Sequence, residues 1–363
     1  MTDFNRNVYC LLGLPFDAVG MESVIQRVRD AAKYRTGYFF STPNLNFLIG
    51  CRRDAAFRDS VINSQLSIVD GMPLIWIARI LGIAINERVA GSAMFDKLGE
   101  HAGEPLSVFF FGGQEGVAAA AAAKLASDWK GLRCAGFHCP GFGSVAEMSD
   151  EETIQKINAS GADFLVVALG ARKGQAWIEH NRARISVPVI SYLGAVVNFV
   201  AGTVNRAPVW MQRSGLEWLW RIKEEPILWH RYFTDGKEFF GLLVTRVLPY
   251  AWYLRRNQPS TADLAAATFD FTQQGQECVL SFTGTWAVQN MERLRPCFAR
   301  AAAMGQNIQL NMAQVGYVDS AFIGLVMLLY KSQHRHGRKL RIEHLQTQIQ
   351  SVFRWNCADF LLE

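Results

Sequence analysis

The chain has 363 residues, of which 50% are hydrophobic and 19% are charged, with a formal net charge of +5. This length predicts two domains, since domains usually run to about 100–200 residues. The charge is too small to indicate a nucleic-acid-binding protein. Seven scattered cysteines without a CxxC pair are typical of reduced thiols in a cytosolic compartment. The first residues lack the pattern of a signal peptide, and no apolar run reaches the ~20 residues of a membrane span.

The first 200 residues alternate short apolar runs with helical patterns. The runs are continuous rather than alternating, which is typical of strands covered on both faces, so we expect a Rossmann-like, open parallel α/β sheet. The expected strands are Tyr38–Ser41, Leu66–Val69, Leu106–Phe111, Leu132–Phe137, Phe164–Leu169 and Val187–Tyr192. The expected helices cover residues 21–35, 44–63, 72–82, 115–130, 150–160 and 173–184.

Small and polar residues follow these strands at their carboxyl ends. In open α/β sheets, ligands bind at this edge, and helix N-termini there favour anions such as a diphosphate. The residues expected at this edge are Thr42, Asn44, Asp70, Gly112, Gly113, Gly170, Lys173 and Gln175.

Asp70 is the candidate catalytic carboxylate. It is placed either to act as a general base or to bind a sugar hydroxyl, or it caps a helix that begins near Met72. Arg88 pairs either with a phosphate or with Glu87 or Asp96. The chain has no Asp-x-Asp pair to hold a divalent metal on a diphosphate, so we expect no metal and no cofactor, with arginines and helix dipoles stabilising the leaving group.

Residues 206–256 are rich in tryptophan and arginine, with nine Lys or Arg against five Asp or Glu. This combination favours an anionic lipid surface over nucleic acid. The alternative is an ordinary helix whose Glu217, Arg221 and Glu225 form a solvated ion-pair ladder. The candidate lipid-diphosphate and membrane residues are Arg206, Arg213, Trp218, Arg221, Arg231, Trp252 and Arg255.

Residues 257–267 have the polar composition of a linker, and a small α/β unit follows them. Its strands are expected at Phe269–Thr272, Val279–Phe282, Ile308–Met312 and Leu340–Glu343, and its helices at Asn290–Ala303, Ala321–His334 and Gln346–Arg354. This unit has no cluster of catalytic groups. Ser320 lies at a helix start, as an N-cap or as an exposed hydroxyl.

The first 250 residues resemble the WecG/TagA/CpsF glycosyltransferases, glycosyltransferase family 26. The matching motifs are Thr42-Pro43-Asn44, Val69-Asp70-Gly71-Met72-Pro73, Glu87-Arg88-Val89-Ala90-Gly91-Ser92, Phe111-Gly112-Gly113, Ala168-Leu169-Gly170-Ala171, Asn205-Arg206-Ala207-Pro208, Gly215-Leu216-Glu217-Trp218-Leu219-Trp220-Arg221 and Glu225-Pro226. The resemblance implies an inverting, metal-independent transfer of a sugar from a UDP donor to a polyprenyl-diphosphate-linked saccharide, in the synthesis of bacterial surface or exopolysaccharide. The sugar would be N-acetylmannosamine, its uronic acid, or glucose.

The resemblance also implies roles for particular residues. Asp70 matches the base, Thr42, Asn44 and Arg88 match polar residues of the substrate site, and the arginine-rich tail matches an appendage that covers the site at the cytoplasmic membrane surface. We therefore expect domains at residues 1–205 (transferase), 206–256 (appendage), 257–267 (linker) and 268–363, and a location on the inner face of the cytoplasmic membrane.

One motif departs from the family pattern. The family usually reads Gly-x-Pro-Lys-Gln-Glu after the fifth strand, whereas this chain has Gly170-Ala171-Arg172-Lys173-Gly174-Gln175. The substrate-contacting glutamine would fall at Gly174. Either Gln175 substitutes for it, or the donor sugar differs, or activity is reduced; we favour a different sugar.

Residues 268–363 resemble a STAS domain, on the motif Val318-Asp319-Ser320-Ala321-Phe322-Ile323-Gly324. Regulatory STAS domains carry a phosphorylated hydroxyl directly after Asp-Ser, and here that position is Ala321. A docking role toward a protein partner is therefore favoured over a phospho-switch, and self-association is left open. The alternative function for the whole chain is a degenerate, non-catalytic scaffold that recruits partners through this domain.

Overall fold

The computed structural model describes residues 3–274 and 277–363, except for the side chains of residues 126–128, 213 and 274. Its contacts divide the chain into two compact units. The six-stranded unit holds Val19–Ile75 and Glu87–Gly236, and the four-stranded unit holds the chain up to Ala18, Trp76–Asn86 and Lys237–Glu363. The domain boundaries expected from the sequence stay a prediction.

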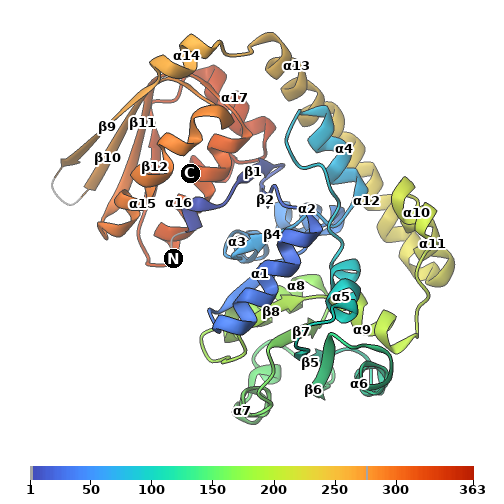
Figure 1. Ribbon diagram of the computed structural model, residues 1–363. Helices are drawn as coiled ribbons and strands as arrows, with labels where there is room; N and C mark the ends of the chain where they lie inside the picture. The colour runs from blue at the N-terminus through green and yellow to red at the C-terminus, as the bar shows by residue number, and fades with distance from the viewer. Residues whose placement is uncertain (1–2, 275–276) are drawn as a thin grey trace. The chain divides into compact units, whose positions relative to one another are not determined.

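The six-stranded unit is built on the expected parallel sheet. Its strands are β3 (Tyr38–Ser41), β4 (Leu66–Ser67), β5 (Leu106–Gly112), β6 (Leu132–His138), β7 (Phe164–Ala168) and β8 (Val189–Tyr192). They lie in the order β4-β3-β8-β7-β5-β6, and all neighbours are parallel (Figure 1). In β5 every residue is buried, which explains its mainly apolar sequence; the buried Ser107 hydroxyl donates to Asp163 Oδ2 at 2.6 Å.

Two hydrophobic cores cover the two faces of this sheet. One contains residues of α1 (Met21–Tyr34), α5 (Gly91–Glu100), α6 (Val117–Asp128) and α9 (Gly194–Ala201). The other contains residues of α7 (Glu151–Ala159) and α8 (Ala171–Asn181), including the fully buried Trp177. The open parallel α/β fold is therefore confirmed.

The helix expected over residues 44–63 is two helices, α2 (Leu45–Arg53) and α3 (Ala55–Ile62). The break falls at Asp54, whose extended backbone and side-chain carboxylate cap α3 by accepting a hydrogen bond from the Phe57 amide at 3.1 Å. The next helix, α4, covers Met72–Ile80.

One topological switch point lies between the adjacent strands β3 and β8, whose following helices pack on opposite faces of the sheet. The chain leaves β3 for α2, α3 and β4 at one edge of the sheet, whereas it leaves β8 for α9, which packs with α6 beside the other strands. Loops that diverge from adjacent parallel strands open a crevice at their carboxyl ends. The residues that follow β3 and β8 therefore border the ligand site of this fold.

A run of helices follows α9. These are α10 (Val209–Ser214), α11 (Glu217–Glu224), α12 (Trp229–Leu242), a π-helical turn at Leu243–Val247 and α13 (Leu248–Arg256). No helix among the described residues has the length and apolar character to cross a bilayer.

The four-stranded unit contains the sheet β12-β11-β10-β9. Its strands are β9 (Thr268–Gln274), β10 (Glu277–Trp286), β11 (Asn307–Val318) and β12 (Leu340–Glu343), and its helices are α14 (Thr261–Ala266), α15 (Arg295–Ala303), α16 (Ser320–His334) and α17 (Thr347–Trp355). Strands β10 and β11 are longer than the sequence predicts. The expected linker contains α14, which begins with a capping box made by Ser260 and Asp263.

An N-terminal hairpin also belongs to the four-stranded unit. Its strands β1 (Val8–Leu11) and β2 (Leu14–Asp17) pair through a turn in which Leu12 and Gly13 both have positive φ. The hairpin packs on α16, where a Cβ at Gly324 would lie 2.5 Å from the Val8 carbonyl oxygen. Only glycine permits this close backbone approach.

Candidate active site

The loop after β3 forms one wall of the candidate site. Thr42 is buried, and Asn44 caps α2 by accepting a hydrogen bond from the Phe47 amide at 3.2 Å. The Asp70 amide donates to the Pro43 carbonyl at 3.0 Å, so the loop after β4 runs beside it. A Cβ at Gly71 would lie 3.6 Å from the Asn44 Cβ. Thr42, Asn44 and Asp70 are therefore brought together at the switch point.

Asp70 lies at the N-terminus of α5 and next to Arg88. Its Oδ2 accepts from the amide of Gly91, the first residue of α5, at 3.3 Å, and its Oδ1 accepts from Arg88 Nη2 at 3.3 Å. The side chain is 23% exposed. Both hydrogen-bond partners lie outside α4, so the carboxylate does not cap the helix at Met72 among the described residues.

Arg88 is shared between two carboxylates. The same Nη2 lies 2.7 Å from Glu217 Oε2 and 3.3 Å from Asp70 Oδ1, and Nη1 donates to the Gln212 carbonyl at 3.5 Å. Neither Glu87 nor Asp96 is its partner: Glu87 accepts from the Met21 amide, and Asp96 pairs with Arg206.

Burial raises the pKa of Asp70, and two charges act on it in opposite directions. The Arg88 guanidinium lowers this pKa, whereas the Glu217 carboxylate raises it. The net effect is upward, toward the range in which a carboxylate accepts a proton more readily. Asp70 thus has the properties of a partly accessible base held by a single arginine.

The glycine residues expected at this edge of the sheet lie in the turns that precede α6 and α8. Gly113 donates its amide to the Ala168 carbonyl at 2.9 Å, and Gly112 packs against Leu169, both with positive φ. Gly170 is exposed and precedes α8 with a φ of 82°. A helix therefore begins beside each of these glycine turns, as the sequence predicts.

The motif that differs from the family pattern, residues 170–175, contacts neighbouring segments of the protein. Arg172 pairs with Asp54, and Lys173 Nζ donates to the Gly143 carbonyl at 2.9 Å. Gln175 is fully buried, and its Nε2 donates to Ser41 Oγ at 3.0 Å. Gln175 therefore supports β3 from beneath the loop that carries Thr42.

Gly174 is matched to an aromatic ring at the switch point. A Cβ at Gly174 would lie 2.6 Å from Tyr192 Cδ2, so the ring at the end of β8 fills the space that a side chain at 174 would need. Tyr192 also lies against Phe47, with ring centroids 5.7 Å apart. Burial raises the pKa of Tyr192 to about 12, while the nearby Arg231 and Arg221 oppose the shift. Its hydroxyl therefore stays protonated at neutral pH.

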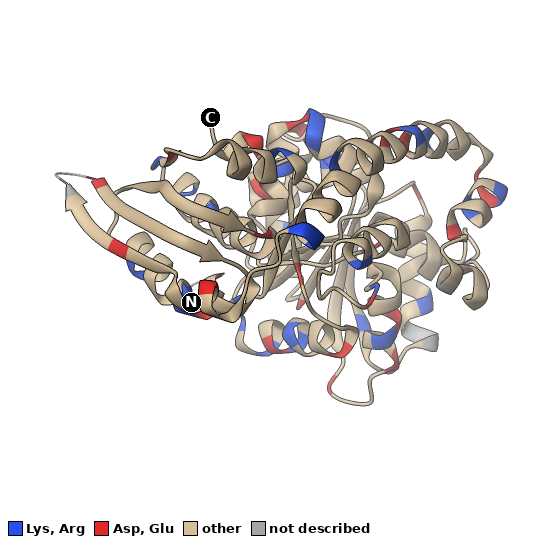
Figure 2. Ribbon diagram, turned by 90° about the horizontal axis from the view of Figure 1, so that it is seen from above, with Lys and Arg blue, Asp and Glu red and all other residues tan. Residues whose placement is uncertain are grey.

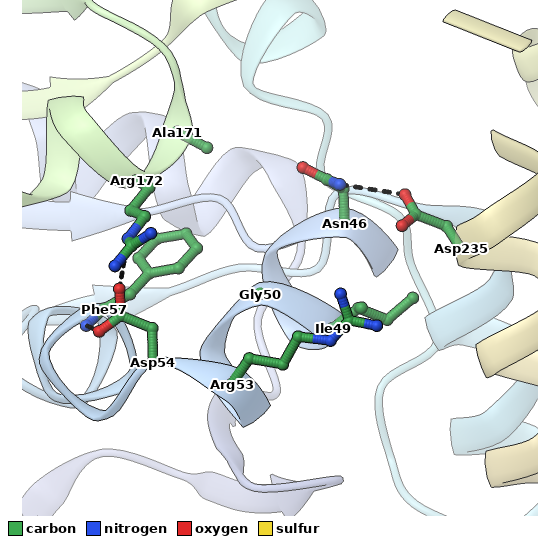
Figure 3. A pocket seen from close by; sticks show the side chains of 9 residues that line it. All are labelled: Asn46, Ile49, Gly50, Arg53, Asp54, Phe57, Ala171, Arg172 and Asp235. Atoms are coloured by element: carbon green, nitrogen blue, oxygen red, sulfur yellow. Dashed lines mark hydrogen bonds and ion pairs between the residues drawn. The ribbon is translucent and has the colours of Figure 1, made fainter. Parts of the chain in front are cut away.

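A pocket of about 360 Å³ lies beside this edge of the sheet (Figure 3). Asn46 Nδ2 donates to the buried Asp235 carboxylate of α12 at 3.0 Å on one side, and the Arg172–Asp54 pair closes the other. Arg53 lines the wall between them. The pocket has both charged and apolar walls and adjoins Asn44 through α2. No group of three His, Cys, Asp or Glu side chains suited to a metal occurs in residues 3–274 and 277–363.

The arginines expected to meet lipid fall into two sets. Arg206 pairs with Asp96 and Arg221 with Glu225, and both guanidinium groups lie over the Phe199 ring at 5.1 and 5.5 Å. The second set comprises Arg231 and, in the four-stranded unit, Arg255, both of which are exposed. The side chain of Arg213 lies outside what the structure describes. Figure 2 shows Lys and Arg interspersed with Asp and Glu along the helices.

Exposed apolar side chains concentrate in the helices after α9. Of the sixteen exposed large hydrophobic residues in the described chain, eleven lie between residues 209 and 252. In the six-stranded unit they include Trp210, which is 63% exposed, and Trp218, which is 43% exposed. In the four-stranded unit they include Trp252. Exposed large apolar side chains are therefore more frequent in these helices than in the rest of the described chain.

Sequence reasoning missed Glu217 as a residue of the site. Its spacing from Arg221 fits a helical ion-pair ladder, but Arg221 bonds Glu225 at 2.7 Å instead, and Glu217 reaches Arg88. Tyr192 was also missed, because it reads as the end of a buried strand. Only its position at a strand end, two residues before Gly194, could have indicated it.

The fold is that of an α/β protein with an open parallel sheet. An aspartate, an arginine and helix N-termini lie at the carboxyl edge of this sheet, where proteins of this class bind their ligands. Residues 9–251 match the protein-family model of the glycosyl transferase WecG/TagA/CpsF family. The chain therefore belongs to the WecG/TagA/CpsF family of glycosyl transferases. Residues 269–360 match a second family model, the Mlab, STAS domain.

Two relatives and one solved structure are similar to parts of the chain. An N-acetylglucosaminyldiphosphoundecaprenol N-acetyl-beta-D-mannosaminyltransferase of Bacillus spizizenii is 27% identical over 209 residues, 57% of this chain and 79% of the relative. The enzyme of the same name from Bacillus subtilis is 26% identical over 205 residues, 56% of this chain and 78% of the relative. The phosphorylated Bacillus cell fate determinant SpoIIAA covers 26% of this chain and 89% of its own, at 16% identity and a TM-score of 0.24.

Proposed function

We propose that this glycosyltransferase moves a sugar from a UDP-sugar to a polyprenyl-diphosphate-linked saccharide, inverting the anomeric carbon. The two relatives are named for transfer of N-acetylmannosamine to a diphosphoundecaprenol-linked sugar. The observation that carries the mechanism is Asp70, a partly exposed carboxylate with a raised pKa at the switch point of the sheet.

In the proposed reaction Asp70 removes the proton from an acceptor hydroxyl. The hydroxyl oxygen bonds to the anomeric carbon of the donor as the bond from that carbon to the UDP oxygen breaks, so UDP leaves with the electron pair. Arg88 and the N-termini of α6 and α8 stabilise the charge that develops on the diphosphate. The chain has no Asp-x-Asp pair for a metal–diphosphate complex, so we propose that these groups suffice.

The donor is proposed to be UDP-N-acetylmannosamine, its uronic acid or UDP-glucose. The relatives' names favour the first. The Gly174–Tyr192 pair occupies the place where the family carries a glutamine, which favours a different sugar. Tyr192 presents a protonated hydroxyl there, so it can donate a hydrogen bond to a donor hydroxyl or carboxylate.

The acceptor is proposed to reach the site along the exposed aromatic helices at the inner face of the cytoplasmic membrane. Trp210, Trp218 and Arg231 supply apolar and cationic groups of the kind that bind an anionic lipid surface. The STAS-like domain is proposed to dock a protein partner. Its Ser320 is buried at the start of α16, which disfavours phosphorylation there.

The test is transfer from a panel of UDP-sugars to a polyprenyl-diphosphate-linked N-acetylglucosamine, with UDP release and the glycolipid product both measured. We expect one donor to give UDP and product in equal amounts. Absence of transfer from every donor, with a folded protein, would instead support the scaffold function, in which partners bind through the STAS-like domain.

A further inference from the structure

Glu217 joins the exposed helix α11 to the catalytic carboxylate through a single guanidinium. Its Oε2 lies 2.7 Å from Arg88 Nη2, and the Asp70 Oδ1 lies 3.3 Å from the same nitrogen. Glu217 thus holds the shorter of the two bonds. All three side chains are between 17% and 25% exposed, so water screens their interaction only in part.

Helix α11 makes few other contacts. None of its residues is buried, and its second face carries the exposed Trp218 and Leu219. Besides Glu217, the described contacts of α11 with other segments include the Trp220 indole, which donates to the Asn205 carbonyl at 3.1 Å, and Glu224, which accepts from Asn205 at 3.4 Å. Arg221 lies over Phe199, and the Trp218 ring lies 6.3 Å from that of Tyr232. A helix held at its surface by a few polar contacts opens at a low free-energy cost.

The charges that act on Asp70 from the surrounding elements are those of Arg88 and Glu217. Arg88 stabilises the ionised form, and Glu217 opposes it, while the Gly91 amide adds one hydrogen bond. If Glu217 leaves, Arg88 keeps one carboxylate partner in place of two. The planar guanidinium can then pair with Asp70 through two nitrogens, which is the stronger geometry for an arginine and a carboxylate. A carboxylate in such a pair is a poorer base.

We propose that Glu217 is a positioning residue that makes the reactivity of Asp70 depend on the docking of α11. With α11 docked, Glu217 draws Arg88 toward itself and leaves Asp70 loosely held and able to take a proton. With α11 undocked, Arg88 pairs with Asp70 through two nitrogens, and Asp70 becomes a poorer base. This inference rests on the proposed role of Asp70 as base.

The test compares Glu217→Gln, which keeps the size of the side chain and removes its charge, with Glu217→Asp and with wild type. The matched control is Glu224→Gln, because Glu224 lies on the same helix and contacts only Asn205 in the described residues. For each protein we would measure the pH dependence of kcat/KM with the lipid-linked acceptor in anionic vesicles. A second readout is the pKa of Asp70, from the ¹³C signal of its carboxyl group.

In Glu217→Gln we expect the pKa of Asp70 to fall, because the charge that raises it is gone. The acid limb of the profile then moves to lower pH, and the rate at its plateau falls by about 3- to 10-fold, as expected for a weaker base. Glu217→Asp should recover part of both changes, and Glu224→Gln should match wild type.

Two results would overturn the inference. One is an equal loss of rate at every pH without movement of the acid limb, which would mean that Glu217 only stabilises the fold. The other is an unchanged Asp70 pKa in Glu217→Gln. If wild type itself transfers no sugar, the proposed function fails, but the carboxyl titration still decides whether Glu217 acts on Asp70.

Discussion

Replacing Arg88 with methionine tests the charge arrangement of the site most sharply. The change removes one cation and leaves Asp70 and Glu217 facing each other. Because both carboxylates contact one nitrogen, they lie at most about 6 Å apart, where two unit charges at an effective dielectric constant near 20 repel by roughly 3 kcal/mol. Partial exposure reduces this value, so we expect the free energy of unfolding to fall by about 2 kcal/mol at pH 8.

The sign of the pH dependence follows from the same picture. Without Arg88, the folded protein holds a proton on Asp70 more readily than the unfolded chain does. The loss of unfolding free energy caused by Arg88→Met therefore becomes smaller as the pH falls from 8 to 5. Adding Glu217→Gln to Arg88→Met removes the second charge and should recover at least half of the loss at pH 8.

The assay is urea unfolding at pH 8, 6.5 and 5, followed by circular dichroism and tryptophan fluorescence, whose coincident transitions check two-state behaviour. Arg341→Met is the control, since Arg341 pairs with Glu277 at 3.5 Å and its side chain is 52% exposed. We expect its cost to stay below about 1 kcal/mol. An Arg88→Met cost no larger than the control, or no recovery in the double variant, would refute the shared-cation arrangement.

Three further predictions follow from other contacts. Gly174→Ala should lower the free energy of unfolding by about 1–3 kcal/mol, since its Cβ meets the Tyr192 ring, and Tyr192→Val in the same chain should restore part of it in urea unfolding. Burial raises the pKa of Asp319 to about 6, so the folded state binds a proton more readily than the unfolded chain does, and the stability that this group contributes falls as the pH rises from 4 to 6. Asp319→Asn keeps an amide oxygen that can cap α16, and in urea unfolding it should reduce the dependence of the free energy of unfolding on pH across that range. A pH dependence identical to that of wild type would contradict this prediction. Trp210→Ser with Trp218→Ser should weaken sedimentation with anionic vesicles several-fold and change stability by no more than about 0.5 kcal/mol, because both side chains are exposed; unchanged sedimentation would remove them from the proposed membrane surface.

The parallel sheet could be predicted from the sequence because its strands are buried on both faces. In Leu106–Gly112 the only polar side chain is that of Ser107 and every residue is buried, a pattern typical of a strand covered on both faces. The position of Asp70 beside Thr42 and Asn44 follows from the same reasoning, since the carboxyl ends of parallel strands share an edge. These residues can be placed from the sequence because each directly follows a strand that the sequence predicts.

Long-range contacts could not be predicted in this way. The partner of Glu217 lies 129 positions earlier in the chain, and the spacing within α11 offers Arg221 as an equally good local partner. The sequence analysis expects no element at the hairpin β1–β2, whose strands have only four residues each, and the packing of this hairpin on α16 joins the two ends of the chain. The split at Asp54 was missed because aspartate is tolerated on a helix surface as well as at a cap.

The measurement that tests the account most directly is the transfer rate of Asp70→Asn with the donor that wild type uses. The amide keeps the size and the hydrogen-bonding oxygen of the side chain but accepts no proton from the acceptor hydroxyl. We expect kcat to fall by about 100-fold or more, with the circular dichroism spectrum and unfolding transition close to those of wild type. A folded Asp70→Asn protein that transfers sugar at the wild-type rate would contradict the account.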